Sequence, residues 1–250
     1  MPSYTLITGA SSGIGKATAE LLAKHGRNLI LIARRGERLA AIKTALEEQY
    51  SIEVITEALD LKDKKKTEQF FSSISHLQID AVINNAGLAV ERLPFDQYNF
   101  NDVQEMVDVN ISAFLRVAHA GMPFLKKSKG HLVNLGSIAG MQAYGGGAVY
   151  CGTKHFVHAF SHGLRQDLLG SGVRVTVIAP GNVDTEFSMV RFKGDTAKAT
   201  VVYDGYEPLH AADIAAAVYH ALSAPPHVNT ELMLVMPTAQ AGLTIAKKSR

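Results

Sequence analysis

The chain has 250 residues, of which 47% are hydrophobic and 19% charged, a composition that fits one large α/β domain over residues 1–250. A net charge of +2 disfavours nucleic-acid binding, so we interpret the basic clusters as solvated surface or terminus: Lys62–Lys66, Lys126–Lys129 and Lys247–Arg250. One cysteine, Cys151, excludes an internal disulfide, and with no leader pattern or bilayer-length apolar run the sequence predicts a cytoplasmic protein without a membrane span.

Short apolar runs bounded by Gly, Asn or Asp predict seven buried strands. They are Tyr4–Thr8, Asn28–Ala33, Ile52–Ala58, Ala81–Asn84, His131–Leu135, Val173–Ala179 and Leu232–Val235. Helical periodicity predicts helices between them, at Ile14–His25, Leu39–Gln49, Ser112–Leu125, Val149–Leu169 and Ala211–Leu222. Because strands and helices alternate, we expect an α/β fold with a doubly wound, seven-stranded parallel sheet and helices on both faces.

Two segments fall outside this alternation. Residues 181–210 follow the sixth strand and form the least regular stretch, with mixed polar, aromatic and glycine residues. Long loops at the carboxyl ends of parallel strands commonly bind ligands, so we expect this segment to cover a substrate as a lid. Residues 240–250 are expected to form a disordered tail.

A glycine-rich turn joins the first strand to the first helix. The string TGASSGIG places Gly9, Gly13 and Gly15 at that turn, where they permit a tight bend, a close approach to a pyrophosphate and close helix packing. The helix N-terminus then attracts phosphate, and we expect Gly9, Ser11, Ser12, Gly13, Ile14 and Gly15 to bind a dinucleotide. The alternative, glycines that only punctuate a turn, is disfavoured by the strand and helix on either side.

Two arginines end the second predicted strand. A carboxylate at this place would bind the 2′-hydroxyl of NAD, but the sequence has Ala33, Arg34 and Arg35. Guanidinium groups suit the 2′-phosphate of NADP, so we expect NADP(H) as the cofactor, with Arg34 and Arg35 near that phosphate. The alternative is that both arginines simply begin a solvent-facing helix.

Two further strand ends carry polar residues. Asp60 and Leu61 follow the third strand and are candidates for contact with the adenine, while Asn84–Gly87 ends the fourth strand. Taken alone, an Asp after a strand is often a helix cap, and Asn-Ala-Gly often only makes a turn.

A serine, a tyrosine and a lysine form the candidate catalytic set. Ser137 ends the fifth strand, and Tyr150 and Lys154 lie four residues apart on the next helix, hence on one face. We expect the Lys154 ammonium to lower the pKa of Tyr150 toward the range of efficient proton transfer. Tyr150 would then exchange a proton with the substrate oxygen, which Ser137 would hydrogen-bond. Tyrosine and lysine four apart occur on many ordinary helices, so the inference depends on the whole set converging on one crevice.

From the first strand to about Thr238 the sequence resembles the short-chain dehydrogenase/reductase family. The matching motifs are TGASSGIG, NNAG, Ser137 with YCGTK, and Pro180-Gly181. The resemblance implies a Rossmann fold, a homodimer or homotetramer, and a second role for Lys154 on the nicotinamide ribose. It also implies that Asn110 holds a water in a proton relay to Lys154. The cofactor contacts that it adds are Asn85, Pro180, Gly181, Val183 and Thr185.

Two longer strings, PGNVDTEFSMVRFKGD and HVNTELMLVMPTAQAG, resemble a branch with 3-hydroxy acid, serine or allo-threonine dehydrogenases and sulfoacetaldehyde reductases. Such substrates are small and anionic, so the resemblance implies a cation near the reacting carbon. Arg191 is the candidate, with a solvated surface arginine as the alternative. We expect Met141 and Tyr144 to shape the pocket wall.

Other functions remain open at this point. The same fold and cofactor could serve hydrophobic ketones such as acyl thioesters, steroids or quinones, or the chain could be a non-catalytic NADPH-binding scaffold. No metal is expected, because the histidine stripe His155, His158 and His162 lacks the adjacent glutamate of a metalloprotease. Cys151, beside Tyr150, is interpreted as a buried inert side chain rather than a redox switch.

Overall fold

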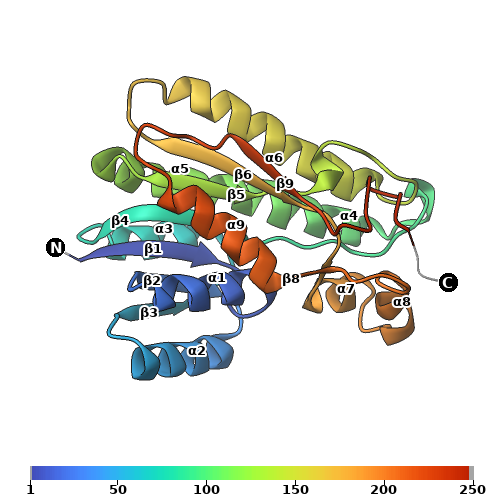
Figure 1. The fold of residues 1–250 in the computed structure, drawn as a ribbon, viewed down its shortest axis with the longest axis horizontal. Helices are drawn as coiled ribbons and strands as arrows, with labels where there is room; N and C mark the ends of the chain where they lie inside the picture. Colours follow the sequence, from blue (N-terminus) through green and yellow to red (C-terminus); the bar gives the residue numbers. More distant parts are fainter. Residues whose placement is uncertain (1, 248–250) are drawn as a thin grey trace.

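The computed structural model describes residues 2–247, and its centre is a seven-stranded sheet in the order β3-β2-β1-β4-β5-β6-β9 (Figure 1). The strands are β1 Ser3–Thr8, β2 Asn28–Ala33, β3 Val54–Ala58, β4 Gln78–Asn84, β5 His131–Leu135, β6 Arg174–Pro180 and β9 Leu232–Val235. Every neighbouring pair is parallel. The predicted fold class is confirmed, and each predicted strand is present within three residues at either end.

The strands are apolar on both faces because each face packs against helices. In β1, Leu6 belongs to one hydrophobic cluster and Ile7 to the other, since successive strand residues point to opposite sides. One face carries α1 (Gly13–Lys24), α2 (Gly36–Gln49) and α9 (Ala211–Ser223). The other carries α3 (Lys64–Ser73), α5 (Phe114–Ser128) and α6 (Ala148–Asp167).

Between β3 and α5, three helical segments were missed by the periodicity. Helix α3 is short and mostly polar, and α4 (Phe100–Val107) has only two buried residues. Asp63 and Asn99 cap them by accepting hydrogen bonds from Lys66 N and Asn101 N, so each helix carried a readable start signal. The third is a π-helical turn, η2 (Asp108–Ala113), between α4 and α5. The described residues also contain two short 3₁₀ turns, η1 (Phe95–Gln97) and η3 (Ile138–Gly140).

The predicted lid, residues 181–210, is more regular than expected. It contains β7 (Val183–Asp184), α7 (Glu186–Arg191), α8 (Thr196–Val201) and β8 (Leu209–His210), with β7 and β8 paired in parallel. Thr185 and Asp195 cap the two helices through their side chains. Figure 1 shows α7 and α8 beyond the end of the sheet toward which the strand arrows point. The helices are too short to leave a periodic pattern in the sequence.

The chain after β9 departs from the expected disordered tail. Gln240 is buried, its side chain accepts a hydrogen bond from Asn182 N, and it forms a bridge with Ala246. These contacts tie residues 240–247 to the turn after β6, a long-range contact that local composition does not reveal. The remaining tail residues, 248–250, and with them most of the basic cluster Lys247–Arg250, lie outside the described residues.

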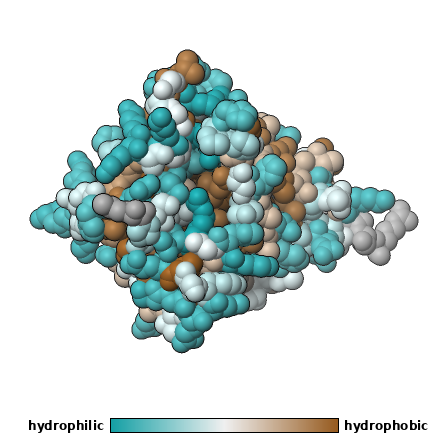
Figure 2. Space-filling view, turned by 60° about the vertical axis from the view of Figure 1, so that its left-hand side comes forward, coloured by the Kyte–Doolittle hydropathy of each residue, from teal (hydrophilic) through white to brown (hydrophobic). Residues whose placement is uncertain are grey.

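The surface is mixed in character. Hydrophilic side chains cover most of the face shown in Figure 2, and hydrophobic side chains gather in a narrower region near its centre. Across residues 2–247, none of the helices is both long and apolar enough to cross a bilayer.

Candidate active site

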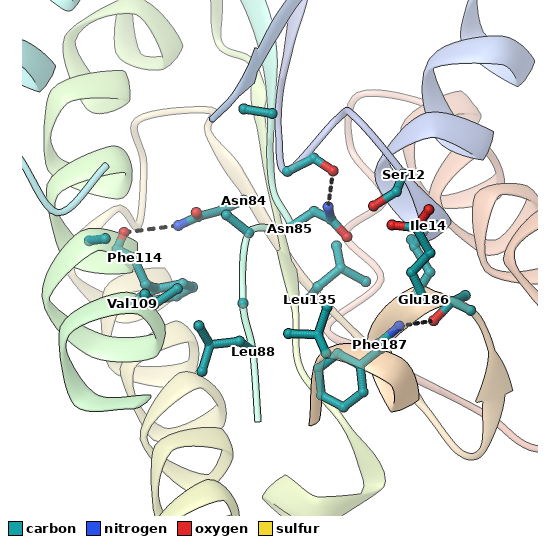
Figure 3. A pocket seen from close by; sticks show the side chains of 18 of the residues that line it. Ser12, Ile14, Asn84, Asn85, Leu88, Val109, Phe114, Leu135, Glu186 and Phe187 are labelled. Atoms are coloured by element: carbon teal, nitrogen blue, oxygen red, sulfur yellow. Dashed lines mark hydrogen bonds between the residues drawn. The ribbon is translucent and has the colours of Figure 1, made fainter. Parts of the chain in front are cut away.

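A cavity of about 360 Å³ opens at the carboxyl ends of β1, β4, β5 and β6. Figure 3 shows Val109 and Phe114 on one side of it and Ser12 and Glu186 on the other. The predicted residues that line it are Gly9, Ser11, Ser12, Gly13, Ile14, Arg34, Arg35, Asp60, Leu61, Asn85, Ser137, Tyr150, Lys154, Pro180, Gly181, Val183 and Thr185. Residues from the whole length of the predicted site therefore meet in one crevice.

The glycine turn is built for close backbone approach. Gly9 has a φ of +67°, and a Cβ on Gly15 would lie 2.4 Å from the Gly9 carbonyl oxygen, so neither position accepts a side chain without a shift. Helix α1 begins at Gly13, and Ser12 caps it without a side-chain hydrogen bond. The first N–H groups of α1 thus face the cavity uncapped by a side chain, an arrangement that fits the pyrophosphate of a dinucleotide.

The end of β4 is fastened to this turn. Asn85 donates from Nδ2 to the Thr8 carbonyl oxygen at 2.8 Å, and its own backbone N–H donates to Thr8 Oγ1 at 3.0 Å. Thr185 faces the turn from the lid, since a Cβ on Gly13 would lie 3.4 Å from its Cβ. Asn85 therefore has a clear structural role at the cavity wall.

Arg35 lies against the glycine turn. Its Nε donates to Ser11 Oγ at 3.1 Å, and its Nη2 donates to Ser12 Oγ at 2.6 Å. Its Nη1 pairs with Glu186 at 2.8 Å, and Arg38 Nη1 pairs with the same carboxylate at 2.7 Å. Arg35 is also the N-cap residue of α2. It thus begins an exposed helix, as the alternative held, and also faces the cavity.

Asp60 and Leu61 line the cavity just after the end of β3. The Asp60 carboxylate accepts a hydrogen bond from Lys62 N at 3.0 Å, and Arg116 donates to the Leu61 carbonyl oxygen at 3.1 Å. Lys62 is in turn held by Glu105 at 2.7 Å. The turn after β3 is therefore fixed before any ligand arrives.

Tyr150, Lys154 and Ser137 are brought together as predicted. Tyr150 and Lys154 lie on one face of α6, both buried, and the Lys154 Nζ lies 6.0 Å from the centroid of the Tyr150 ring. That ammonium donates to the Leu135 carbonyl oxygen at 2.8 Å, which anchors α6 to the end of β5. Ser137 caps η3 by accepting from Ala139 N at 3.0 Å.

The pKa of Tyr150 does not follow the expected course. We expected Lys154 to lower it, but burial raises the pKa of Tyr150 to about 12, and the cation that opposes this rise is Arg191. Burial also lowers the pKa of Lys154 to about 8. The expected lowering of the Tyr150 pKa by Lys154 was wrong. Both groups are desolvated by burial, and the Lys154 ammonium donates to the Leu135 carbonyl oxygen rather than to the phenol.

Asn110 lies behind the cavity wall, within the π-helical turn. Its Oδ1 accepts from Leu88 N at 2.9 Å, and its Nδ2 donates to the Leu88 carbonyl oxygen at 2.7 Å and to Thr153 Oγ1 at 3.1 Å. Asn110 and Lys154 both face Gly87, where an added Cβ would lie 3.3 Å and 3.7 Å from their side-chain ends. The π-helical turn that carries Asn110 thus separates α4 from α5.

The predicted substrate residues separate into two groups. Arg191, at the end of α7, donates to the Tyr144 hydroxyl, and its guanidinium carbon lies 5.4 Å from the Tyr150 ring centroid. Arg191 and Tyr144 therefore lie beside the candidate catalytic tyrosine. Met141 is 47% exposed, at the end of η3, and has no such contact. None of the three residues is among those that line the cavity of about 360 Å³.

The histidines of α6 face different partners. His155 contacts the Cys151 carbonyl oxygen, and His162 contacts Glu231. Within residues 2–247, no three His, Cys, Asp or Glu side chains gather as a metal site would require. Cys151 is buried, and burial raises the pKa of its thiol, as expected for an unreactive side chain.

Several cavity residues were not predicted. Glu186 and Phe187 come from α7, whose cap, Thr185, was the only readable signal. Arg38, in the first turn of α2, does not line the cavity but pairs with Glu186 beside it, and no signal in the sequence indicated that contact. Leu88 and Val109 form an apolar wall that leaves no distinctive motif.

Comparisons with known proteins agree with this geometry. The family model of the short chain dehydrogenases matches residues 3–196. The chain is 42% identical to a serine 3-dehydrogenase of Agrobacterium fabrum, with both chains covered in full. It is 40% identical to sulfoacetaldehyde reductase 2 of Chromohalobacter salexigens, with 96% of each covered.

The fold also matches solved structures. The closed form of a serine dehydrogenase complexed with NADP⁺ superposes with a TM-score of 0.90 at 37% identity, and 98% of this chain and 100% of that one are covered. Because the family model spans most of the chain and the relatives align along nearly all of it, this chain belongs to the short-chain dehydrogenase family.

Proposed function

We propose that this chain is an NADP(H)-dependent oxidoreductase that interconverts a small hydroxy acid or amino alcohol and its carbonyl form. The observation that carries the proposal is the meeting of Tyr150, Lys154 and Ser137 in the cavity that begins at the glycine turn. A scaffold that only bound a dinucleotide would have no need of this set. The relatives named above, with serine and sulfoacetaldehyde in their names, support the small polar substrate.

The cofactor contacts follow from the fit of the cavity. The turn Gly9–Gly15 and the N-terminus of α1 would hold the pyrophosphate, and Asp60 and Leu61 would contact the adenine. Arg34 and Arg35 would bind the 2′-phosphate. At the other end, Lys154 would bind the nicotinamide ribose, with Asn85, Pro180, Gly181, Val183 and Thr185 along the same groove.

Reduction of a carbonyl requires a proton at the substrate oxygen as well as a hydride at its carbon. When bound, the dinucleotide supplies or accepts the hydride. Tyr150, whose raised pKa keeps its hydroxyl protonated at neutral pH, donates a proton to the substrate oxygen during reduction. Ser137 hydrogen-bonds the same oxygen, and oxidation reverses these roles.

The proton on Tyr150 must be replaced after each reduction. We infer a relay through Lys154, whose pKa of about 8 allows it to lose and regain a proton near neutral pH. Asn110 and Lys154 meet at Gly87, where the absence of a side chain leaves room for a bridging water. Asn110 is therefore proposed to position this water.

Arg191 supports an anionic substrate. Its guanidinium lies beside the Tyr150 and Tyr144 rings, so a carboxylate or sulfonate on the carbon next to the reacting one would reach it. A hydrophobic ketone would instead leave this cation desolvated without an anionic partner. We therefore favour 3-hydroxy acid, serine or allo-threonine, and sulfoacetaldehyde substrates over acyl thioesters, steroids and quinones.

A coupled screen tests the proposal. Purified protein is offered NADP⁺ with 3-hydroxy acids, serine and allo-threonine, and NADPH with sulfoacetaldehyde and with a set of hydrophobic ketones, while nicotinamide absorbance is followed. We expect turnover with the small anions, and more with NADP(H) than with NAD(H). Turnover confined to the hydrophobic ketones would contradict the substrate class, and NADPH binding without any turnover would favour the scaffold.

Assembly and location extend the same proposal. We propose that residues 1–250 form one domain, that the chain assembles as a homodimer or homotetramer, and that it works in the cytoplasm. The exposed apolar side chains of the edge strand β9 support the assembly. The buried free thiol of Cys151 supports the cytoplasmic location.

A further inference from the structure

One carboxylate joins the lid to the predicted 2′-phosphate site. Glu186, in the first turn of α7, accepts hydrogen bonds from Arg35 Nη1 at 2.8 Å and from Arg38 Nη1 at 2.7 Å. These two arginines are at the start of α2, far from Glu186 in sequence. Figure 3 shows Glu186 beside Ser12 and Ile14 at the cavity wall.

The Glu186 carboxylate occupies the donor group that an incoming phosphate would use. Arg35 uses its other two nitrogens on Ser11 and Ser12, so its Nη1, the one turned to Glu186, is the donor group that an added anion would have to share. A phosphate dianion is a stronger partner for guanidinium groups than a carboxylate. The same contact that a phosphate needs is therefore the contact that holds α7 against α2.

Positioning of the arginines is a weaker explanation of the contact. Arg35 is held in place by two hydroxyls of the glycine turn, at 3.1 Å and 2.6 Å, independently of Glu186. The hydrogen bonds from both arginines lower the pKa of Glu186, so it stays ionised throughout the neutral range and its charge is available to compete.

We propose that Glu186 is a specificity-determining residue that competes with the 2′-phosphate of the dinucleotide for Arg35, and that Arg38, which shares the same carboxylate, joins Arg35 in binding that phosphate. The inference rests on the proposed NADP(H) dependence. Without the phosphate, Glu186 latches α7 to α2. With the phosphate, the two guanidinium groups turn to the ligand and α7 is released, so the charge on one ligand group is coupled to the position of the lid.

Binding of two adenosine nucleotides tests the competition. Adenosine 2′,5′-bisphosphate carries the 2′-phosphate and 5′-ADP lacks it, and neither has a nicotinamide, so calorimetric titration measures this end of the site without turnover. We expect Glu186→Gln to bind adenosine 2′,5′-bisphosphate about 3- to 10-fold more tightly than the unmodified chain, as expected for two exposed ion pairs. Affinity for 5′-ADP should change by less than about twofold, because it makes no such contact.

The matched control is Glu37→Gln. Glu37 is an exposed glutamate in the first turn of α2, so its removal changes the local charge by the same amount. An equal gain in Glu37→Gln would overturn the specific competition and leave only a general electrostatic effect.

A fluorescent reporter tests the release of the lid. The chain has no tryptophan, so Met189→Trp, at a half-exposed position of α7, gives a single emitter. We expect adenosine 2′,5′-bisphosphate to change its emission and 5′-ADP to leave it unchanged. In the Glu186→Gln background the emission should already resemble the ligated form.

The outcomes separate the inference from the proposed function. If the unmodified chain prefers adenosine 2′,5′-bisphosphate but Glu186→Gln binds it equally or more weakly, the competition is wrong and the NADP(H) proposal stands. If the unmodified chain has no preference between the two nucleotides, the NADP(H) proposal fails and the inference fails with it.

Discussion

Tyr150 sits in a buried position between two cations that act on it differently. Lys154 anchors α6 to the end of β5 through the Leu135 carbonyl oxygen, while Arg191 faces the tyrosine ring and lowers the pKa that burial raises. Burial thereby keeps the phenol protonated, although the Arg191 guanidinium of α7 lies 5.4 Å from its ring centroid. A tyrosine in this setting is suited to donate a proton only when the substrate oxygen is in place.

Removing the phenol hydroxyl tests this assignment. We expect Tyr150→Phe to lower kcat by about 10²- to 10⁴-fold, the usual contribution of a general acid. NADPH affinity should stay within about twofold, because the ring still fills the same buried volume. Steady-state rates and NADPH fluorescence titration measure the two quantities, and a variant that keeps its turnover would contradict the role of Tyr150.

Arg191→Gln should change both the substrate preference and the pH profile. Loss of the guanidinium should raise KM about 10-fold or more for carboxylate and sulfonate substrates, as for a lost charged hydrogen bond, and less for neutral ones. Because Arg191 lowers the pKa of Tyr150, its removal raises that pKa, so the basic limb of the kcat profile for carbonyl reduction, in which Tyr150 must be protonated, moves to higher pH.

The matched control is Arg92→Gln. Arg92 lies 4.8 Å over the Tyr144 ring and is exposed, and it does not face Tyr150. It should change neither the KM ratio nor the basic limb. Equal effects of the two variants would remove Arg191 from the substrate site.

At single positions, the sequence predicted where a residue lies better than it predicted its pKa or the direction of its side chain. Helical spacing brought Tyr150 and Lys154 to one face, and the glycines and Ser137 lie where their motifs predicted. The pKa of Tyr150 could not be predicted, because burial in the folded chain raises it and Arg191, which is remote in sequence, lowers it. Met141 was misplaced for a similar reason, since η3 decides which way its side chain turns.

At the level of elements, the packing of α1 on β1 decides whether the glycine turn keeps its shape. Gly15 is the contact point, since any Cβ there meets the Gly9 carbonyl. The neighbouring N–H groups can face a phosphate only while this contact stays close.

Gly15→Ala should therefore lower stability by about 1–3 kcal/mol, the usual cost of overpacking, and weaken NADPH binding at least about 10-fold. The control is Gly163→Ala on α6, where an added Cβ meets nothing within 4 Å. That variant should be neutral or more stable by about 0.5–1 kcal/mol, since alanine favours a helix. Urea unfolding and NADPH titration compare the two, and equal behaviour would contradict the close-packing role of Gly15.

The elements that the sequence predicted bury more of their residues than the elements that it missed. The strands are continuous apolar runs because both faces are covered, so they were recognisable. Helices α3, α4, α7 and α8 bury few residues or are only six to ten residues long, so their periodicity is weak. The ordered segment 240–247 was missed because its partner, Asn182, is distant in sequence.

On the scale of the molecule, the site is assembled at the carboxyl ends of the strands, while β3 and β9 form the two edges of the sheet within residues 2–247. β9 pairs with β6 alone in the sheet, and Leu232 and Leu234 on it are 39% and 41% exposed. An apolar edge strand of this kind favours pairing with another chain. The proposed oligomer would cover it without blocking the cavity, which opens at the strand ends.

Leu234→Lys tests this surface. A charge on the edge strand opposes burial against a second copy, so we expect the assembly to fall to about half its mass, because a desolvated unpaired ammonium is costly. Leu169→Lys is the control, since Leu169 is 91% exposed at the end of α6, away from β9. Light scattering after size exclusion measures both variants. An unchanged mass for Leu234→Lys would exclude β9 from the interface, while NADPH binding should persist in either case because the cofactor cavity lies within one chain.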